Sequence, residues 1–221
     1  MQNILTPLSG GDLGAASNAG FPAVSEPENS QDPPPIPPGM ILREAGPDDI
    51  IGLLRLGREL LSETDHFVRR PEERAADLSD MRRIVDYYAV TPGWAMIHVW
   101  DGTEAVAEGV LSVGGLARTA HVGTLGIGIL RRYWGRGLGR RMMADLERRA
   151  AEYGVERLEF TVLAHNRRAR DFYGRLGYSE DGRRVRSVRY APDSPSEPVR
   201  YGDEIALSKW IGPADCITIG D

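Results

Sequence analysis

Residues 131–141 read RRYWGRGLGRR, a stretch with three glycines within five positions and arginines on either side. A strand-like run, HVGTLGIGIL, precedes it at 121–130, and a helix-like run, RRMMADLERRAAEYG, follows at 140–154. Glycine at the start of a helix costs up to about 1 kcal/mol relative to alanine. The three glycines therefore predict a strand-to-helix loop whose backbone approaches a ligand closely, and phosphate is the usual ligand of such a loop.

Two common phosphate-binding loops do not fit this stretch. The nucleotide-hydrolase loop G-x-x-x-x-G-K-[ST] needs a lysine, which the stretch lacks. The dinucleotide loop G-x-G-x-x-G follows an early strand of a parallel βαβ unit. Here Gly135, Gly137 and Gly139 have the spacing G-x-G-x-G and follow a series of expected hairpins. The stretch therefore predicts an anion-binding loop of another class.

The segments around the loop predict an α+β domain. Alternating hydrophobic residues indicate strands, and hydrophobic residues at helical spacing indicate helices. Strands are expected near residues 40–45, 94–100, 104–113, 121–130, 155–164, 183–190 and 203–210, and helices near 47–63, 73–90, 138–154 and 166–177. Asp101-Gly102 is a strong hairpin turn. The order predicts a layered domain with a mixed, mostly antiparallel sheet flanked by helices.

Composition sets the domain boundaries and the broad class of protein. The 221 residues are 41% hydrophobic and 27% charged, which is typical of a soluble globular protein. Residues 1–39 are rich in Pro, Ser and Asn and predict a disordered, polyproline-like extension. The domain is expected at 40–212, with a short tail at 213–221.

Charge and cysteine content exclude several classes of function. The net charge of −5 argues against a nucleic-acid partner, but residues 131–189 hold 16 Arg against 8 acids, which favours an anionic ligand. The single cysteine, Cys216, excludes a disulfide framework and a cysteine-rich metal site. No apolar run approaches the roughly 18 residues of a membrane span, and no secretory signal is recognised. We expect a cytoplasmic protein without a membrane partner.

Two motifs together resemble the GNAT superfamily of acyl-CoA-dependent N-acetyltransferases. Arg132-Tyr-Trp-Gly135-Arg-Gly137 matches R/Q-x-x-G-x-G/A. LEFTVLAHNRRARDFYGRLGY at 158–178 is similar to the strand, Asn-x-x-Ala helix and FYxxxGY ending of that superfamily. The resemblance covers roughly residues 41–210. It implies a GNAT-like layered fold with splayed central strands, and acetyl-CoA as co-substrate without a metal.

The resemblance also implies where acetyl-CoA binds. The loop would wrap the pyrophosphate with the backbone N–H groups of about residues 134–140. Strand backbone near residues 129–130 would pair with the pantetheine arm and stabilise the oxyanion. The Asn166 side chain either contacts the cofactor or caps a helix, and the sequence leaves both open. The expected cofactor-binding residues are Ile129, Leu130, Arg132, Trp134, Gly135, Arg136, Gly137, Leu138, Gly139, Arg140 and Asn166, with Arg167 or Arg168 as a further phosphate contact.

The resemblance makes Tyr173 the general acid that protonates the departing thiolate. A phenol with a pKa near 10 suits this role. Tyr173 also belongs to an apolar helical stripe, so a packing role is the alternative. The amine must lose a proton before it attacks, and the base is less defined. Glu108 is the first candidate, followed by Glu159 and His121, and each of the three also has a structural interpretation. No metal ligands are assigned.

The implied reaction moves the acetyl group of acetyl-CoA to a primary amine of a small molecule or peptide, by direct attack on the thioester. The alternative is a non-catalytic acyl-CoA-binding sensor or docking domain of the same fold. Tyr173 favours the enzyme, because a pure binder has no use for an acid beside the sulfur. A homodimer is compatible with the resemblance, and the identity of the acceptor is left open.

Overall fold

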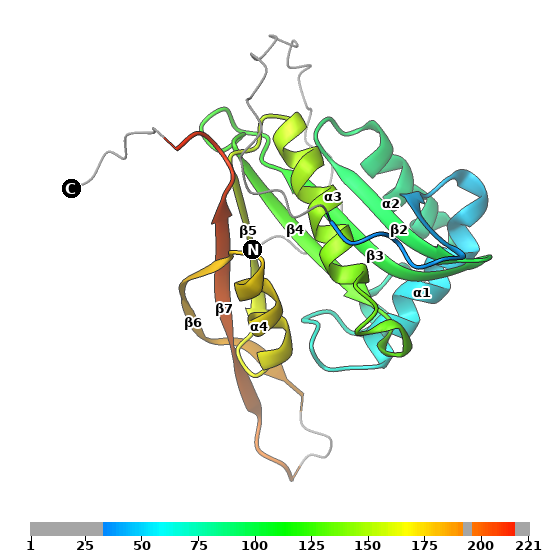
Figure 1. Ribbon diagram of the computed structural model, residues 1–221. Helices are drawn as coiled ribbons and strands as arrows, with labels where there is room; N and C mark the ends of the chain where they lie inside the picture. The colour runs from blue at the N-terminus through cyan, green and yellow to red at the C-terminus, as the bar shows by residue number, and fades with distance from the viewer. Residues whose placement is uncertain (1–32, 192–195, 215–221) are drawn as a thin grey trace.

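The computed structural model describes residues 33–191 and 196–214 (Figure 1). Most of the extension expected at 1–39, and most of the tail expected at 213–221, with Cys216, lie outside these residues. The described elements follow the predicted order. They are β1 Met40–Glu44, α1 Ile50–Ser62, α2 Leu78–Val90, β2 Ala95–Asp101, β3 Glu104–Val113, β4 Val122–Ile129, α3 Leu138–Glu152, β5 Arg157–Leu163, α4 Arg167–Arg175, β6 Ser179–Tyr190 and β7 Arg200–Trp210. Short 3-10 turns lie at Pro47–Asp49, Pro71–Glu73 and Arg131–Tyr133.

The strands form one seven-stranded sheet in the order β1-β2-β3-β4-β5-β7-β6. Every neighbouring pair is antiparallel except β4 and β5, which are parallel. This confirms the predicted α+β class and the mixed, mostly antiparallel sheet. The β4–β5 pairing covers only Val122–Thr124 against Arg157–Glu159, and the two strands then diverge. The expected splay of the central strands is therefore present.

Helices cover both faces of the sheet. α3 and α4 lie in front of it in Figure 1, and α1 and α2 lie behind it. Seven consecutive residues of β3, Ala105–Leu111, are buried, as expected for a central strand with both faces covered. The predicted apolar stripe of α3 is buried at Leu138, Met142, Leu146 and Ala150. Tyr153 departs from that stripe and is 46% exposed, because the helix ends at Glu152.

The second helix starts later than the sequence predicts. Helical spacing suggested a start near residue 73, whereas α2 begins at Leu78. Asp77 caps it by accepting a hydrogen bond from the N–H of Asp80 at 2.9 Å. The residues just before Asp77 do not join the helix, because the Arg74 side chain enters the interior and pairs with Glu108. A tertiary contact therefore decides this boundary.

The chain already touches the domain before Met40. Residues 33–39 form neither helix nor strand, yet Ile36 is half-buried against the core. Pro34 lies beside the glycine loop, with its Cγ 3.7 Å from the place that a Cβ on Gly137 would occupy. Within the part of the chain that the structure describes, no helix has the length and apolar character needed to cross a bilayer.

Candidate active site

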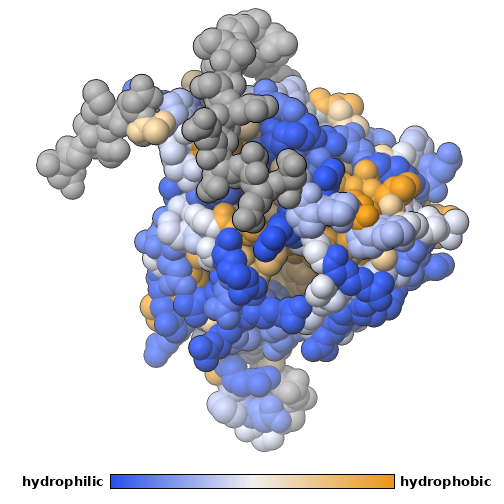
Figure 2. Space-filling model, in the orientation of Figure 1, coloured by the Kyte–Doolittle hydropathy of each residue, from blue (hydrophilic) through white to orange (hydrophobic). Residues whose placement is uncertain are grey.

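A pocket of about 1000 Å³ opens where β4 and β5 diverge. Its lining joins the C-terminal end of β4, the glycine loop and the start of α3 to residues of α1, β5 and α4. On the face drawn in Figure 2, hydrophobic residues lie at the bottom of a hollow that hydrophilic residues surround. The two sequence motifs therefore contribute to one cavity, although they are far apart in the chain.

The glycine loop leaves open space in front of the N-terminus of α3. Gly135 and Gly137 have φ values of +78° and +81°, which side chains rarely adopt. A Cβ on Gly135 would meet no atom within 4 Å. Gly137 is the N-cap residue of α3, so the N–H groups of Leu138, Gly139 and Arg140 in the first helical turn lack acceptors within the helix. The loop thus presents donors and the positive end of a helix to the pocket.

Gly139 serves a different purpose from the other two glycines. A Cβ there would lie 3.0 Å from Cζ of Phe172, so its absence lets α3 and α4 approach closely. This approach places the α4 residue Tyr173 in the same pocket as the loop. On the other side of the loop, the Trp134 indole Nε1 donates to the carbonyl of Ile129 at 2.7 Å. The loop is therefore tied to β4 and packed against α4.

Arg132, the first residue of the loop motif, is held by carboxylates. Its guanidinium pairs with Glu59 of α1 and, at 2.6 Å, with Glu104 of β3. The hydrogen bond that Arg132 donates to Glu59 is the largest cause that raises the pKa of Arg132. The side chain is outside the described lining of the pocket. Its position suits anchoring of the loop to α1 and β3 better than a phosphate contact.

The other expected arginines divide into two groups. Arg140 and Arg168 line the pocket. Arg168 also lies over the Trp134 ring, with Cζ 4.6 Å from its centroid. Arg136 instead stacks on Tyr133, with Cζ 4.8 Å from the ring centroid, and neither it nor Arg167 belongs to the described lining. Two arginines are therefore placed to meet an anion in the pocket.

The backbone that faces the gap is not that of Leu130. The Leu130 N–H donates to the carbonyl of Val106 at 3.1 Å, and the Leu130 side chain is fully buried. In an antiparallel ladder, alternate residues of a strand point their amides to opposite sides. The amides of Ile127 and Ile129 therefore point away from β3, into the gap where β5 no longer pairs with β4. The amides of Ile129 and Ile127 thus face the gap, whereas the Leu130 amide, which was expected there, pairs with β3.

Tyr173 belongs to the pocket lining and to an aromatic cluster. Its ring centroid lies 4.4 Å from that of Phe160 and 5.0 Å from that of Phe172. The residue is 7% exposed, and burial raises the pKa of its phenol. The hydroxyl is protonated at neutral pH, as a general acid requires, but the raised pKa makes it a weaker acid. The geometry supports both the acid and the packing interpretation.

Glu108 lies in the pocket wall but has a fixed partner. Its carboxylate accepts two hydrogen bonds from Arg74, at 3.1 and 2.7 Å, and lies 3.3 Å from Nε2 of His98. All three side chains are buried. Burial alone would raise the pKa of Glu108, but the charge of Arg74 and the contact with His98 hold it well below its usual range. A carboxylate of such low basicity is a poor general base.

The remaining base candidates lie outside the described pocket lining. The Glu159 carboxylate lies 3.3 Å from Nε of Arg157 and is about half exposed. His121 precedes the first residue of β4, whereas the part of β4 that lines the pocket begins at Leu125, about 13 Å away along the strand. The His121 carbonyl accepts the N–H groups of Glu156 and Arg157, which fixes the start of β5. Neither position brings its side chain to the pocket.

Asn166 caps α4 in this structure. Its side-chain oxygen accepts a hydrogen bond from the N–H of Ala169 at 3.1 Å, and the residue also lines the pocket. We predict that Asn166→Ala lowers the free energy of unfolding by about 1 kcal/mol, while Asn166→Asp, which caps equally well, retains it. Denaturant unfolding of the three proteins measures this. Equal stability of Asn166→Ala and the wild type would remove the capping role.

Sequence reasoning missed Arg74 and the glycine that accommodates it. Gly57 lies in the middle of α1, where glycine is unfavourable. A Cβ on Gly57 would lie 2.3 Å from Nε of Arg74, so the glycine makes room for the arginine beneath α1. The signal in the sequence was this glycine within an apolar helix. It indicates a close approach without identifying what approaches.

Comparison with protein families fits this geometry. The model of the Acetyltransferase (GNAT) family matches residues 54–178, more than half of the chain. The chain belongs to the GNAT acetyltransferase family. The matched region spans the pocket from α1 to the end of the second motif. A comparison with curated protein sequences gives no significant match.

Solved structures share the GNAT fold. A GNAT-family acetyltransferase from Streptococcus pneumoniae has a TM-score of 0.70 at 22% identity, over 78% of this chain and 99% of its own. The Salmonella typhimurium protein yncA, solved with its cofactor acetyl-CoA, gives 0.66 at 13%, over 82% and 99%. A GNAT phosphinothricin acetyltransferase from Sinorhizobium meliloti, in complex with acetyl-CoA, gives 0.67 at 14%, over 82% and 95%. At these identities the likeness concerns the fold and leaves the acceptor open.

Proposed function

We propose that this GNAT protein transfers the acetyl group of acetyl-CoA to a primary amine of a small molecule or peptide. The observation that carries the proposal is the single pocket that joins the glycine loop, the gap between β4 and β5, and Tyr173. A donor held by its phosphates at the loop can place its thioester in the gap, within reach of an acid. The two acetyl-CoA complexes of the same fold support this choice of donor.

The donor would bind mainly through backbone groups. The pyrophosphate would lie at the N-terminus of α3, against the amides of its first turn, with Arg140 and Arg168 near it. The pantetheine arm would extend β4, where the amides of Ile127 and Ile129 lack a strand partner. The binding energy of these remote contacts would hold the thioester for attack.

The reaction itself would be a direct transfer. The neutral amine attacks the thioester carbonyl carbon, and the Ile129 N–H stabilises the oxyanion that forms. The C–S bond then breaks, Tyr173 donates its proton to the sulfur, and the nitrogen loses its extra proton. The products are the acetylated amine and coenzyme A with a free thiol. Tyr173 regains a proton from solvent before the next turnover.

We further propose that water in the pocket, and not Glu108, takes the proton of the amine. Glu108 is the base candidate that lines the pocket, yet its bidentate pair with Arg74 makes it weakly basic. Its structural role is to neutralise Arg74, a cation whose side chain is 2% exposed. Glu108 and Arg74 would then shape the floor of the pocket.

Removal of the Glu108 carboxylate should destabilise the fold. Glu108→Ala leaves the Arg74 charge buried without its partner, which typically costs about 3–5 kcal/mol. Glu108→Gln keeps one oxygen acceptor for Arg74 but also removes the negative charge, so it should lose stability as well. Denaturant unfolding of both variants and the wild type gives the comparison. If Glu108→Gln instead kept its stability but lost most of its turnover at neutral pH and regained it at higher pH, Glu108 would be the base.

The activity is tested by release of thiol from acetyl-CoA in the presence of a panel of amines. The panel should contain amino acids, polyamines, drug-like amines and peptides with free N-termini. The proposal predicts amine-dependent thiol release with at least one class, matched by the mass of an acetylated product. Tight donor binding without acetyl transfer to any class would favour the non-catalytic acyl-CoA-binding alternative.

A further inference from the structure

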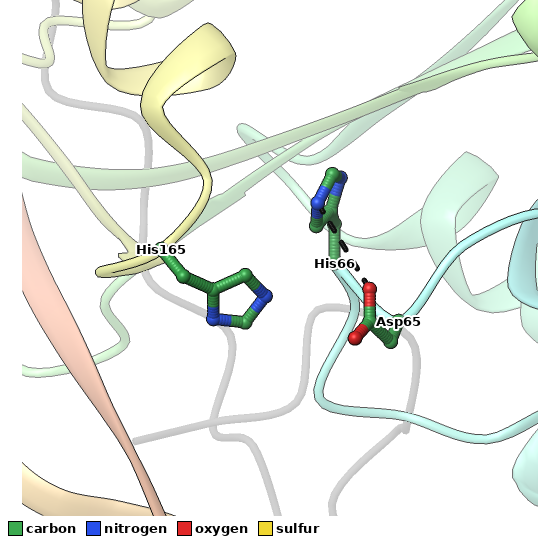
Figure 3. Close-up of side chains that lie close together, drawn as sticks. All are labelled: Asp65, His66 and His165. Atoms are coloured by element: carbon green, nitrogen blue, oxygen red, sulfur yellow. Dashed lines mark ion pairs between the residues drawn. The ribbon is translucent and has the colours of Figure 1, made fainter.

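Three side chains with metal-binding atoms meet at the edge of the pocket. Asp65 and His66 lie in the loop after α1, and His165 lies between β5 and α4. One ligand atom from each residue lies within 4.8 Å of the other two. The centroids of the two imidazole rings are 5.5 Å apart. Figure 3 shows the carboxylate and both rings around a common space.

These residues come from opposite walls of the pocket. The loop after α1 forms the wall on the β4 side, and the turn before α4 belongs to the β5 side. His66 lines the pocket and is half-buried, whereas Asp65 and His165 are exposed. The cluster therefore lies where the pocket meets solvent. His165 also precedes Asn166, the residue that caps α4.

The donor set suits a divalent transition-metal ion. Two imidazole nitrogens and one carboxylate oxygen are ligands that Zn²⁺ accepts, with bonds of about 2.0–2.2 Å and a fourth position for water. Such bonds place donor atoms about 3.4 Å apart in a tetrahedron. The present ion pair between His66 Nε2 and Asp65 is 3.9 Å long, and the Asp65 side chain is 76% exposed. Metal binding would bring the three donor atoms, now within 4.8 Å of one another, to that closer separation.

A simple ion pair explains only part of this arrangement. Asp65 and His66 are neighbours in sequence and can pair without help from elsewhere. His165 reaches the same space from a different element, and the two imidazole rings lie there at an angle of 49° to each other.

We propose that Asp65, His66 and His165 form a binding site for a divalent transition-metal cation, with Zn²⁺ as the characteristic ligand, and that the cation ties the two walls of the pocket together at its mouth. The acetyl transfer proposed above uses no metal. The site would therefore control how the pocket opens and would take no part in the chemistry. The sequence interpretation assigned no metal ligands, because the three residues converge only through the fold.

The test is a Zn²⁺ titration of the untagged, metal-free protein in competition with a chromophoric chelator. We expect one saturable site per chain. His66→Ala and His165→Ala should each weaken binding by at least roughly 10-fold, since even an outer-shell partner of a metal ligand is worth that much. His121→Ala is the matched control, because it removes a histidine far from the cluster, and should bind like the wild type. Cys216→Ser should also bind normally, which excludes the only thiol in the sequence.

The possible outcomes distinguish a metal site that bridges the two walls from the absence of such a site. Absence of a saturable site, or wild-type affinity in both cluster variants, overturns the metal site. Weakening in only one of the two histidine variants overturns the bridge between the walls. Melting curves without Zn²⁺ identify a variant that fails to fold, and His→Gln then replaces His→Ala at that position. Binding of Co²⁺ with the strong visible absorption of tetrahedral coordination supports the proposed ligand geometry. None of these readouts depends on acetyl transfer.

Discussion

Replacing Gly137 by glutamate is expected to remove nearly all affinity for acetyl-CoA while the protein remains folded. Gly137 ends the loop at φ +81° and lines the pocket beside Pro34, so the new carboxylate would enter the space where the pyrophosphate is expected. Two unit charges about 4 Å apart repel by about 4 kcal/mol at an effective dielectric constant of 20. That energy corresponds to a loss of roughly 1000-fold in affinity.

Backbone strain must be separated from charge in this experiment. A side chain in the left-handed region costs about 1–2 kcal/mol of stability wherever it occurs. Gly154 provides a matched control, because it has φ +86°, lies beyond the far end of α3 and has open space around its Cβ position. Gly154→Glu should lower the melting temperature similarly and bind the donor normally. A folded Gly137→Glu protein with wild-type donor affinity would remove the loop from the donor site.

Tyr173→Phe is expected to lower kcat by roughly 100-fold, a typical contribution of general acid catalysis. The substitution keeps the ring, which packs 4.4 Å from Phe160, and removes only the hydroxyl, the proposed proton donor to the thiolate. Donor affinity should barely change, because the proposed phosphate contacts lie at the glycine loop and stay intact. Single-turnover kinetics with a good acceptor measures the effect, since slow product release can hide it in kcat.

Tyr178 is the matched control for the aromatic cluster. Its hydroxyl donates to Glu147 at 3.0 Å, and its ring centroid lies 5.9 Å from that of Tyr173. Tyr178→Phe should therefore lower stability and leave the transfer rate unchanged, which is the reverse of the pattern for Tyr173→Phe. If both variants lose stability and neither slows the chemical step by more than about threefold, Tyr173 has a packing role.

The sequence predicted those features that depend on local patterns. The order of strands and helices follows from periodicity, and the turn at Gly135–Gly137 follows from residues that tolerate positive φ. The splay between β4 and β5 came only from the family resemblance. Local sequence patterns predict the conformation of a single segment, and the glycine loop is such a segment.

The features that sequence reasoning missed depend on contacts between distant segments. Arg74 joins Glu108 beneath α1, and this contact changes both the start of α2 and the chemical character of the first base candidate. The choice of Ile127 over Leu130 requires the register of β4 against β3, which fixes the side to which each amide points. His66 and His165 meet only because the two pocket walls face each other. Hydrophobic periodicity within one segment does not predict these contacts between distant segments.

The most direct test of the account is a crystal structure of the protein with a non-hydrolysable analogue of acetyl-CoA. The account predicts the pyrophosphate within hydrogen-bond distance of the amides at the start of α3. It places the pantetheine arm along Ile127 and Ile129, and the sulfur near the hydroxyl of Tyr173. An analogue bound elsewhere, or bound at the loop with its thioester outside the gap between β4 and β5, would contradict the proposed site.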